Sequence, residues 1–90
     1  MIKKKKDYLS YFQALRKIIN KHDPMSLMDA APEDEYDMEV EKILASTYRL
    51  NSLAKIEKII YDTFVNNFGD EARIAEDLYH KIAKEWLEIK

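Results

Sequence analysis

The chain has 90 residues, of which 47% are hydrophobic and 36% charged, and its formal net charge is −2. This size and composition predict one globular domain, residues 1–90, and exclude a disordered protein. With one Gly, two Pro and no Cys, the chain excludes a turn-rich all-β domain and a disulfide framework.

The first predicted element is a helix over residues 5–21. Its apolar residues recur at helical spacing: Tyr8, Tyr11, Phe12, Leu15, Ile18 and Ile19. Asp23 and Pro24 are then typical of a helix start, as N-cap and first helical residue. Because Pro32 disfavours helix at the residue before it, we expect a short helix over residues 25–29 and a loop over residues 30–36.

Asp37 can cap the next helix, whose apolar stripe is Val40, Ile43, Leu44, Thr47 and Tyr48. Asn51 and Ser52 interrupt this pattern, and either can cap the helix that follows. That helix is predicted over residues 53–68 from Leu53, Ile56, Ile59, Ile60, Phe64 and Phe68.

Gly69 is expected in the left-handed conformation after this helix, and Asp70 is expected to cap the last one. The stripe of the last helix is Ile74, Leu78, Ile82, Trp86 and Ile89. Short joints make neighbouring helices antiparallel. The sequence therefore predicts an all-α fold, a compact antiparallel four-helix bundle with a short extra helix and an acidic loop between the first two long helices.

The charges are segregated along the chain. Residues 1–21 carry seven basic side chains and one acid, residues 22–41 carry eight acids and no Lys or Arg, and residues 42–90 carry eight of each. Like charges at the density found in the loop repel unless something neutralises them. This favours a docking surface for a basic protein partner, with Glu33, Asp34, Glu35 and Tyr36 as the partner-binding residues.

A structural interpretation of the same acids stays open. Asp23 and Asp37 would cap helices, Tyr36 would fill the core, and the other acids would be solvated. The basic first segment could also pair with the acidic one, in contacts that salt would weaken.

Other chemistry finds little support. With no Cys and one Gly, a thiol nucleophile and a Gly-rich phosphate cradle are excluded, so we expect no enzyme, no catalytic residue and no cofactor. The two histidines and the Gly-free acidic loop match no zinc, calcium or di-iron ligand pattern, so we expect no metal site. Lysines 3–6 have no interleaved aromatic residue, and the pI of about 5.7 argues against nucleic acid.

The aromatic residues divide into two groups. Six lie on the helical stripes and are predicted to be core: Tyr8, Phe12, Tyr48, Phe64, Phe68 and Trp86. Tyr11, Tyr61 and Tyr79 lie near the edges of stripes, and would form a partner site if they emerged together on one face.

Residues 23–44, DPMSLMDAAPEDEYDMEVEKIL, carry a resemblance to a known family. The string Ala-Pro-Glu-Asp-Glu-Tyr-Asp at 31–37, preceded by Asp23-Pro24, resembles the signature of the YugE-like small helical domain family of unknown function, from Bacillus and related bacteria. This chain has Asp29-Ala30 where relatives usually carry Gly, and Met38 where they often carry Pro. The resemblance implies a helical fold over most of the chain and leaves the activity open.

The function expected from the sequence is a non-enzymatic protein-binding module that uses its acidic loop. An immunity or antitoxin-like protein that neutralises a basic toxin surface is one alternative, and a structural protein that self-associates through exposed Tyr residues is another. No apolar run reaches the roughly 20 residues of a membrane span, and charges interrupt any signal-peptide core. We therefore expect a cytoplasmic monomer or weak homodimer without membrane contact.

Overall fold

The computed structural model describes residues 3–28 and 34–90, and every regular element among them is helical. In chain order these elements are α1 (Lys3–His22), α2 (Asp37–Thr47), α3 (Leu53–Phe68), the 3-10 helix η1 (Gly69–Ala75) and α4 (Glu76–Ile89). The described residues contain no strand. The prediction of an all-α fold is therefore confirmed.

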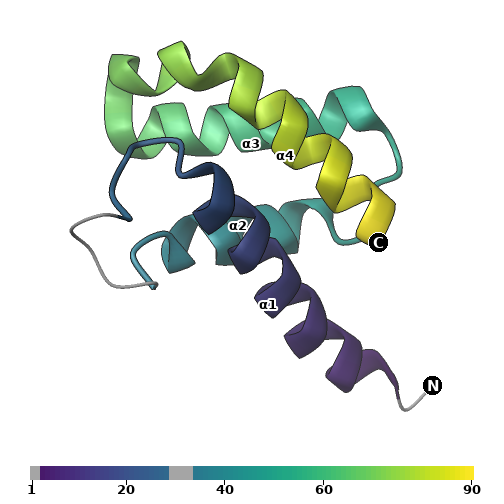
Figure 1. Cartoon of the computed structure of the whole chain (residues 1–90). Helices are drawn as coiled ribbons and strands as arrows, with labels where there is room; N and C mark the ends of the chain where they lie inside the picture. Colours follow the sequence, from purple (N-terminus) through teal and green to yellow (C-terminus); the bar gives the residue numbers. More distant parts are fainter. Residues whose placement is uncertain (1–2, 29–33) are drawn as a thin grey trace.

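Each of the four α-helices packs against two others, so that the contacts form a ring. α1 packs against α2 and α4, and α3 packs against α2 and α4, with η1 contacting both α3 and α4. Figure 1 shows α3 and α4 side by side, joined through η1 at one end, while the first turns of α1 extend away from the other helices. The Cα radius of gyration is 12.5 Å, and the extents along the principal axes are 41, 29 and 19 Å.

One apolar core is shared by all the α-helices. Its largest fully buried side chains are Trp86, Tyr36, Tyr79, Phe64, Leu15, Ile19, Ile43, Leu44, Ile56, Ile60, Ile82 and Val40. Trp86 is held at both ends of its indole: Nε1 donates to Thr47 Oγ1 at 2.9 Å, and the ring meets Tyr11 edge-to-face at 5.6 Å. Buried polar contacts of this kind fix which helices face each other, because an unpaired donor in the core is costly.

The limits of α3 confirm one of the two expected caps and the positive φ of Gly69, whose ψ lies outside the left-handed helical region. The side chain of Ser52 accepts a hydrogen bond from the backbone N–H of Lys55, which makes Ser52 the N-cap. Gly69 follows the last residue of α3 at φ 80° and ψ −159°, a conformation open mainly to glycine. The chain can therefore leave α3 sharply and enter η1.

Over residues 25–28, the described part of the short helix predicted at 25–29, no helix is formed. Residues 24–28 are non-helical, mostly turns and a bend, and Asp23 and Ser26 have positive φ values of 48° and 57°. The Asp23 carboxylate accepts hydrogen bonds from the backbone N–H groups of Leu27 and Met28, so this segment closes as a turn around Asp23. The extra short helix lies instead at η1, between α3 and α4.

Two predicted caps are also wrong. Asp37 is the first residue of α2, and its carboxylate accepts two hydrogen bonds from the Arg16 guanidinium, at 2.9 and 2.8 Å. This contact is one ion pair between the basic and acidic segments of the sequence. Asp70 lies within η1, six residues before α4 begins at Glu76, and it accepts a hydrogen bond from Arg73.

At the start of the last predicted helix, the buried residues are not those of the predicted apolar stripe. Ile74 is 88% exposed, whereas Ala72, Ala75 and Tyr79 are buried. A 3-10 helix has three residues per turn and an α-helix has 3.6, so the inward-facing positions of η1 do not continue those of α4. Ile89 and Tyr8, both predicted to be core, are likewise half-exposed at the ends of their helices.

Candidate protein-binding groove

The structure describes three of the four predicted partner-binding residues. Glu33 lies outside the described residues, and Asp34 and Glu35 are exposed just before α2. Tyr36 is fully buried and meets the rings of Phe64 and Phe68 edge-to-face. Tyr36 is therefore part of the core, and a partner cannot use it as a surface anchor.

Tyr36 is the centre of a polar contact with the turn that follows α1. Its hydroxyl donates to Asp23 Oδ1 at 2.7 Å and accepts from the backbone N–H of Met25 at 2.9 Å. Burial, together with the hydrogen bond to Asp23, raises the pKa of Tyr36 well above its usual value. Asp23, at the end of α1, and Tyr36, just before α2, thus hold each other in place.

The three edge tyrosines do not share an exposed face. Tyr79 is fully buried, with its hydroxyl donating to the Ala72 carbonyl at 2.8 Å. Tyr61 packs edge-to-face on Tyr79, while Tyr11 lies between Tyr48 and Trp86. The condition for a tyrosine partner site, that all three emerge together, is therefore not met.

The histidines serve as partners of carboxylates between helices. His22 Nε2 lies 2.9 Å from Glu85 Oε2, and Lys21 donates to the other oxygen of Glu85 at 2.8 Å, which joins α1 to α4. The hydrogen bonds from Lys21 and His22 lower the pKa of Glu85. His80 makes a similar contact with Glu57. Over residues 3–28 and 34–90, no group of three or more metal-ligating side chains comes together.

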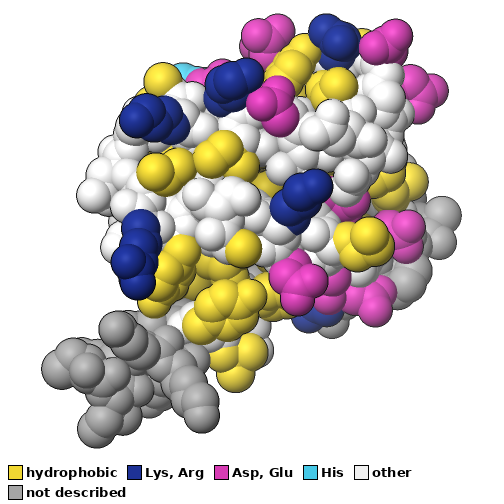
Figure 2. All heavy atoms as spheres, turned by 180° about the vertical axis from the view of Figure 1, so that it is seen from behind, with side chains coloured by type: hydrophobic (Ala, Val, Ile, Leu, Met, Phe, Trp, Pro, Cys, Tyr) yellow, Lys and Arg dark blue, Asp and Glu magenta, His cyan; other side chains and the backbone are white. Residues whose placement is uncertain are grey.

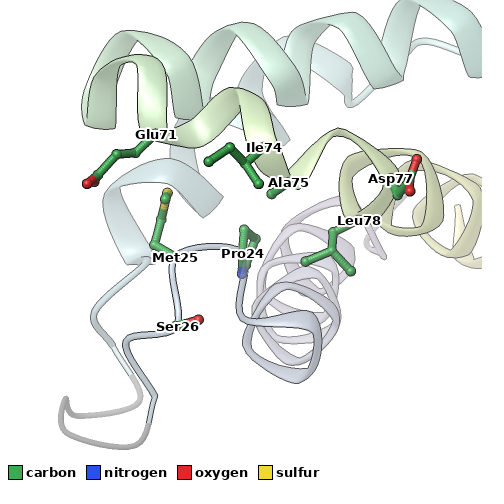
Figure 3. A pocket seen from close by; sticks show the side chains of 8 residues that line it. All are labelled: Pro24, Met25, Ser26, Glu71, Ile74, Ala75, Asp77 and Leu78. Atoms are coloured by element: carbon green, nitrogen blue, oxygen red, sulfur yellow. The ribbon is translucent and has the colours of Figure 1, made fainter.

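A groove of about 440 Å³ lies where the turn after α1 faces η1 and the start of α4. We call it the Ile74 groove. Figure 3 shows its lining residues: Pro24, Met25, Ser26, Glu71, Ile74, Ala75, Asp77 and Leu78. In this view Ile74 and Ala75 face Pro24 and Met25, with Glu71 at one end and Asp77 at the other. The groove therefore has an apolar middle and a carboxylate at each end.

Local interactions position both walls of the Ile74 groove. The wall made by Pro24 and Met25 is held by the bonds that Asp23 and Tyr36 make to the turn. The opposite wall exists because Gly69 redirects the chain into η1, whose period turns Ile74 out of the core. A largely exposed isoleucine thus results from the fold itself.

The nearby cation is directed away from the groove. Arg73 donates to Asp70 at 3.1 Å and to the Tyr61 hydroxyl at 3.5 Å, on the side of η1 that faces α3. Among the described residues, Glu71 and Asp77 make no ion pair. The Ile74 groove therefore presents negative charge to an incoming group.

A second pocket of about 350 Å³ lies beside α3 and is lined by Ala54, Glu57, Lys58, Tyr61 and Glu76. Most of its charges already have partners within the chain. Glu57 contacts His80, and Lys58 donates to Asp62 at 3.2 Å. The Ile74 groove is the better candidate, since its carboxylates have no such partners in the described chain.

One sequence pattern indicates the groove, an isoleucine between two pairs of acids, but the helical periodicity of the region favoured a different interpretation. Residues 69–78, GDEARIAEDL, place Ile74 between two pairs of acids. The helical stripe assigned Ile74 to the core, so this pattern had no functional interpretation. A break of the helix after Gly69 would have been needed to recognise it.

Comparisons with known proteins add no relative. No protein-family model, no curated protein and no solved structure matches the chain. The resemblance to the YugE-like family stays a prediction from the residues at 23–44. Within the described part of the chain, no helix has both the length and the apolar character needed to span a membrane.

Proposed function

We propose that this chain is a non-enzymatic protein-binding module whose Ile74 groove takes an apolar side chain flanked by basic residues. One observation carries the proposal: Ile74, 88% exposed, lines a groove of about 440 Å³ whose ends carry Glu71 and Asp77. Exposed apolar surface rimmed by polar groups marks interaction sites on small proteins.

The apolar middle would supply affinity. Complete burial of an isoleucine side chain stabilises by about 1.5–3 kcal/mol, and Ile74 buries little of its side chain within its own fold. Met25 and Leu78, both partly buried, would lose further apolar surface to the same ligand. A single apolar anchor from the partner would therefore gain contacts from both walls.

The carboxylates would orient the bound partner and raise the rate of its association. Glu71 and Asp77 flank the anchor, so a ligand with Lys or Arg on both sides of an apolar residue fits best. Asp34 and Glu35, exposed before α2, would add long-range attraction for the same partner. In this proposal the acidic loop steers the partner, and Ile74 rather than Tyr36 anchors it.

We also propose that the helices form an antiparallel four-helix bundle, which the contacts of α1 and α3 with both α2 and α4 support. We infer further that the chain is a member of the YugE-like family and is cytoplasmic. An immunity-like role is the second candidate, because the exposed acids Asp34 and Glu35 suit a basic toxin surface.

The test compares protein capture from native lysate by wild type, Ile74→Glu and Met38→Glu. Met38 is 75% exposed on α2 and does not line the groove, so it is a matched control. We expect one protein to be captured by wild type and by Met38→Glu, and lost with Ile74→Glu. Equal capture by all three variants would contradict a role for the groove.

A further inference from the structure

We propose that the Ile74 groove binds the N-terminal end of α1 from a second copy of this chain, in a head-to-tail contact. The inference rests on the proposed function, because it names an occupant for the same groove. The N-terminal end of α1 means here the first turns of the helix through Leu9. It supplies an apolar anchor with lysines on its N-terminal side, which suits the apolar middle of the groove and the carboxylate at one of its ends.

The apolar part of this ligand is exposed on the molecule. Tyr8 is 42% and Leu9 59% exposed, although both are large hydrophobic residues. In Figure 1 this end of α1 extends away from the other helices, on the opposite side of the molecule from η1. Figure 2 shows hydrophobic side chains gathered beside the N-terminal end of the chain. A second molecule could therefore reach it without rearrangement of the fold.

The charges are complementary between the two surfaces. The sequence carries lysines at positions 3, 4, 5 and 6, followed by Asp7 and then Tyr8 and Leu9, so residues 3–9 hold four basic side chains and one acid. Across the groove, residues 69–78 carry four acids and one arginine, and that arginine is paired with Asp70. Opposite charges on two surfaces steer their encounter and fix its orientation.

The same charges disfavour symmetric pairing. Residues 3–9 carry four Lys and one Asp in the sequence, so two such ends would have the same sign of charge, and two grooves would place carboxylates against carboxylates. Like charges across an interface are unfavourable. Only the head-to-tail contact sets basic against acidic. A head-to-tail contact leaves a free end and a free groove, so assembly continues beyond a dimer.

The test measures mass by sedimentation for the intact chain over a range of concentrations, with two variants. Leu9→Glu disables the α1 end, and Ile74→Glu disables the groove. We expect wild type to exceed the 10.7 kDa of one chain increasingly with concentration, while each variant alone stays monomeric. An equimolar mixture of the variants should form a dimer and stop there, because it retains one intact end and one intact groove.

Several controls keep the result specific. Both substitutions replace exposed side chains, so the unfolding midpoints of the variants should match wild type. Met38→Glu should self-associate as wild type does, and high salt should dissociate the mixed dimer. A wild type that is monomeric up to millimolar concentration, a mixture that stays monomeric, or a variant that dimerises alone would each overturn the inference.

The inference and the proposed function can fail separately. If wild type is monomeric and Ile74→Glu still abolishes capture of another protein, the groove is a binding site with a different occupant. If self-association is found and no other protein is captured, the second copy is the partner. If Ile74→Glu changes neither measurement, both proposals are wrong.

Discussion

The hydroxyl of Tyr36 donates a 2.7 Å hydrogen bond to the carboxylate of Asp23, across the connection between α1 and α2. Asp23 in turn accepts from the backbone of Leu27 and Met28, and Tyr36 accepts from the backbone of Met25. One wall of the Ile74 groove is this turn. A buried core residue therefore positions part of the candidate binding surface.

Tyr36→Phe removes both hydrogen bonds of the hydroxyl while keeping the ring in the core. Asp23 and the Met25 N–H then lose a partner in a partly buried site, which costs about 1–3 kcal/mol. We expect the free energy of unfolding, measured with urea, to fall by about this amount. Binding to the Ile74 groove should weaken as well, because the turn is less fixed.

Tyr8→Phe is the matched control for this substitution. Tyr8 is 42% exposed, and no hydrogen bond of its hydroxyl is found within the described chain. The change in unfolding free energy should stay within about 0.5 kcal/mol. Equal effects of the two substitutions would contradict the structural role of the Asp23–Tyr36 contact.

Thr47→Val tests the polar contact within the core. Thr47 Oγ1 is the acceptor for the indole N–H of Trp86, and valine would leave that donor buried and unpaired. We expect a loss of about 1–3 kcal/mol in unfolding free energy. Thr63→Val is the control, since Thr63 is nearly as buried and its hydroxyl bonds only to the Ile59 carbonyl of its own helix. The loss of unfolding free energy in Thr63→Val should be distinctly smaller than in Thr47→Val, as measured by circular dichroism in urea.

Gly69→Ala tests the turn that creates η1. The backbone there has φ 80° and ψ −159°, and an added Cβ would meet no atom within 4 Å. The cost is therefore backbone strain, about 1–3 kcal/mol, without a packing clash. A synthetic chain with D-alanine at position 69 should be at least as stable as wild type, because its preferred angles are mirrored. A D-alanine chain as unstable as the L-alanine variant would refute this explanation.

Stability should fall at high pH. Burial, and to a lesser extent the nearby Tyr61, raises the pKa of Tyr79 from 10.0 to about 12, so the folded state holds this proton more tightly than the unfolded state. The contribution is complete below pH 10 and is lost as the pH rises from 10 towards 12, at about 1.4 kcal/mol per pH unit. Urea unfolding over this range should show a shallower slope for Tyr79→Phe than for wild type. Identical slopes would mean that Tyr79 titrates normally.

Much of the fold followed from apolar periodicity. The apolar residues from Leu53 to Phe68 match the range of α3, Ser52 is one of the two caps that were expected, and Gly69 has the expected positive φ. These predictions succeeded because strong stripes and local capping chemistry act within a few residues. The prediction of a helix after Pro24 was wrong because the deciding contact is not local. The Asp23 side chain found a partner 13 residues away in Tyr36, which no local pattern reveals.

The candidate site was the least predictable part. The charge pattern identified an acidic region, and Asp34 and Glu35 are indeed exposed. Tyr36 could not be distinguished as core or anchor from the sequence, since aromatic residues are frequent in both roles. Ile74 was assigned to the core because the period was assumed to continue unbroken, whereas η1 changes the number of residues per turn before α4 begins.

The most direct test of the groove places a photoreactive amino acid at position 74 and, separately, at position 38. After irradiation in living cells, we expect an adduct of higher mass from position 74 and none from position 38. Its identity would distinguish a second copy of this chain from another protein. No adduct from position 74, or the same adducts from both positions, would contradict the claim that the Ile74 groove is a protein-binding site.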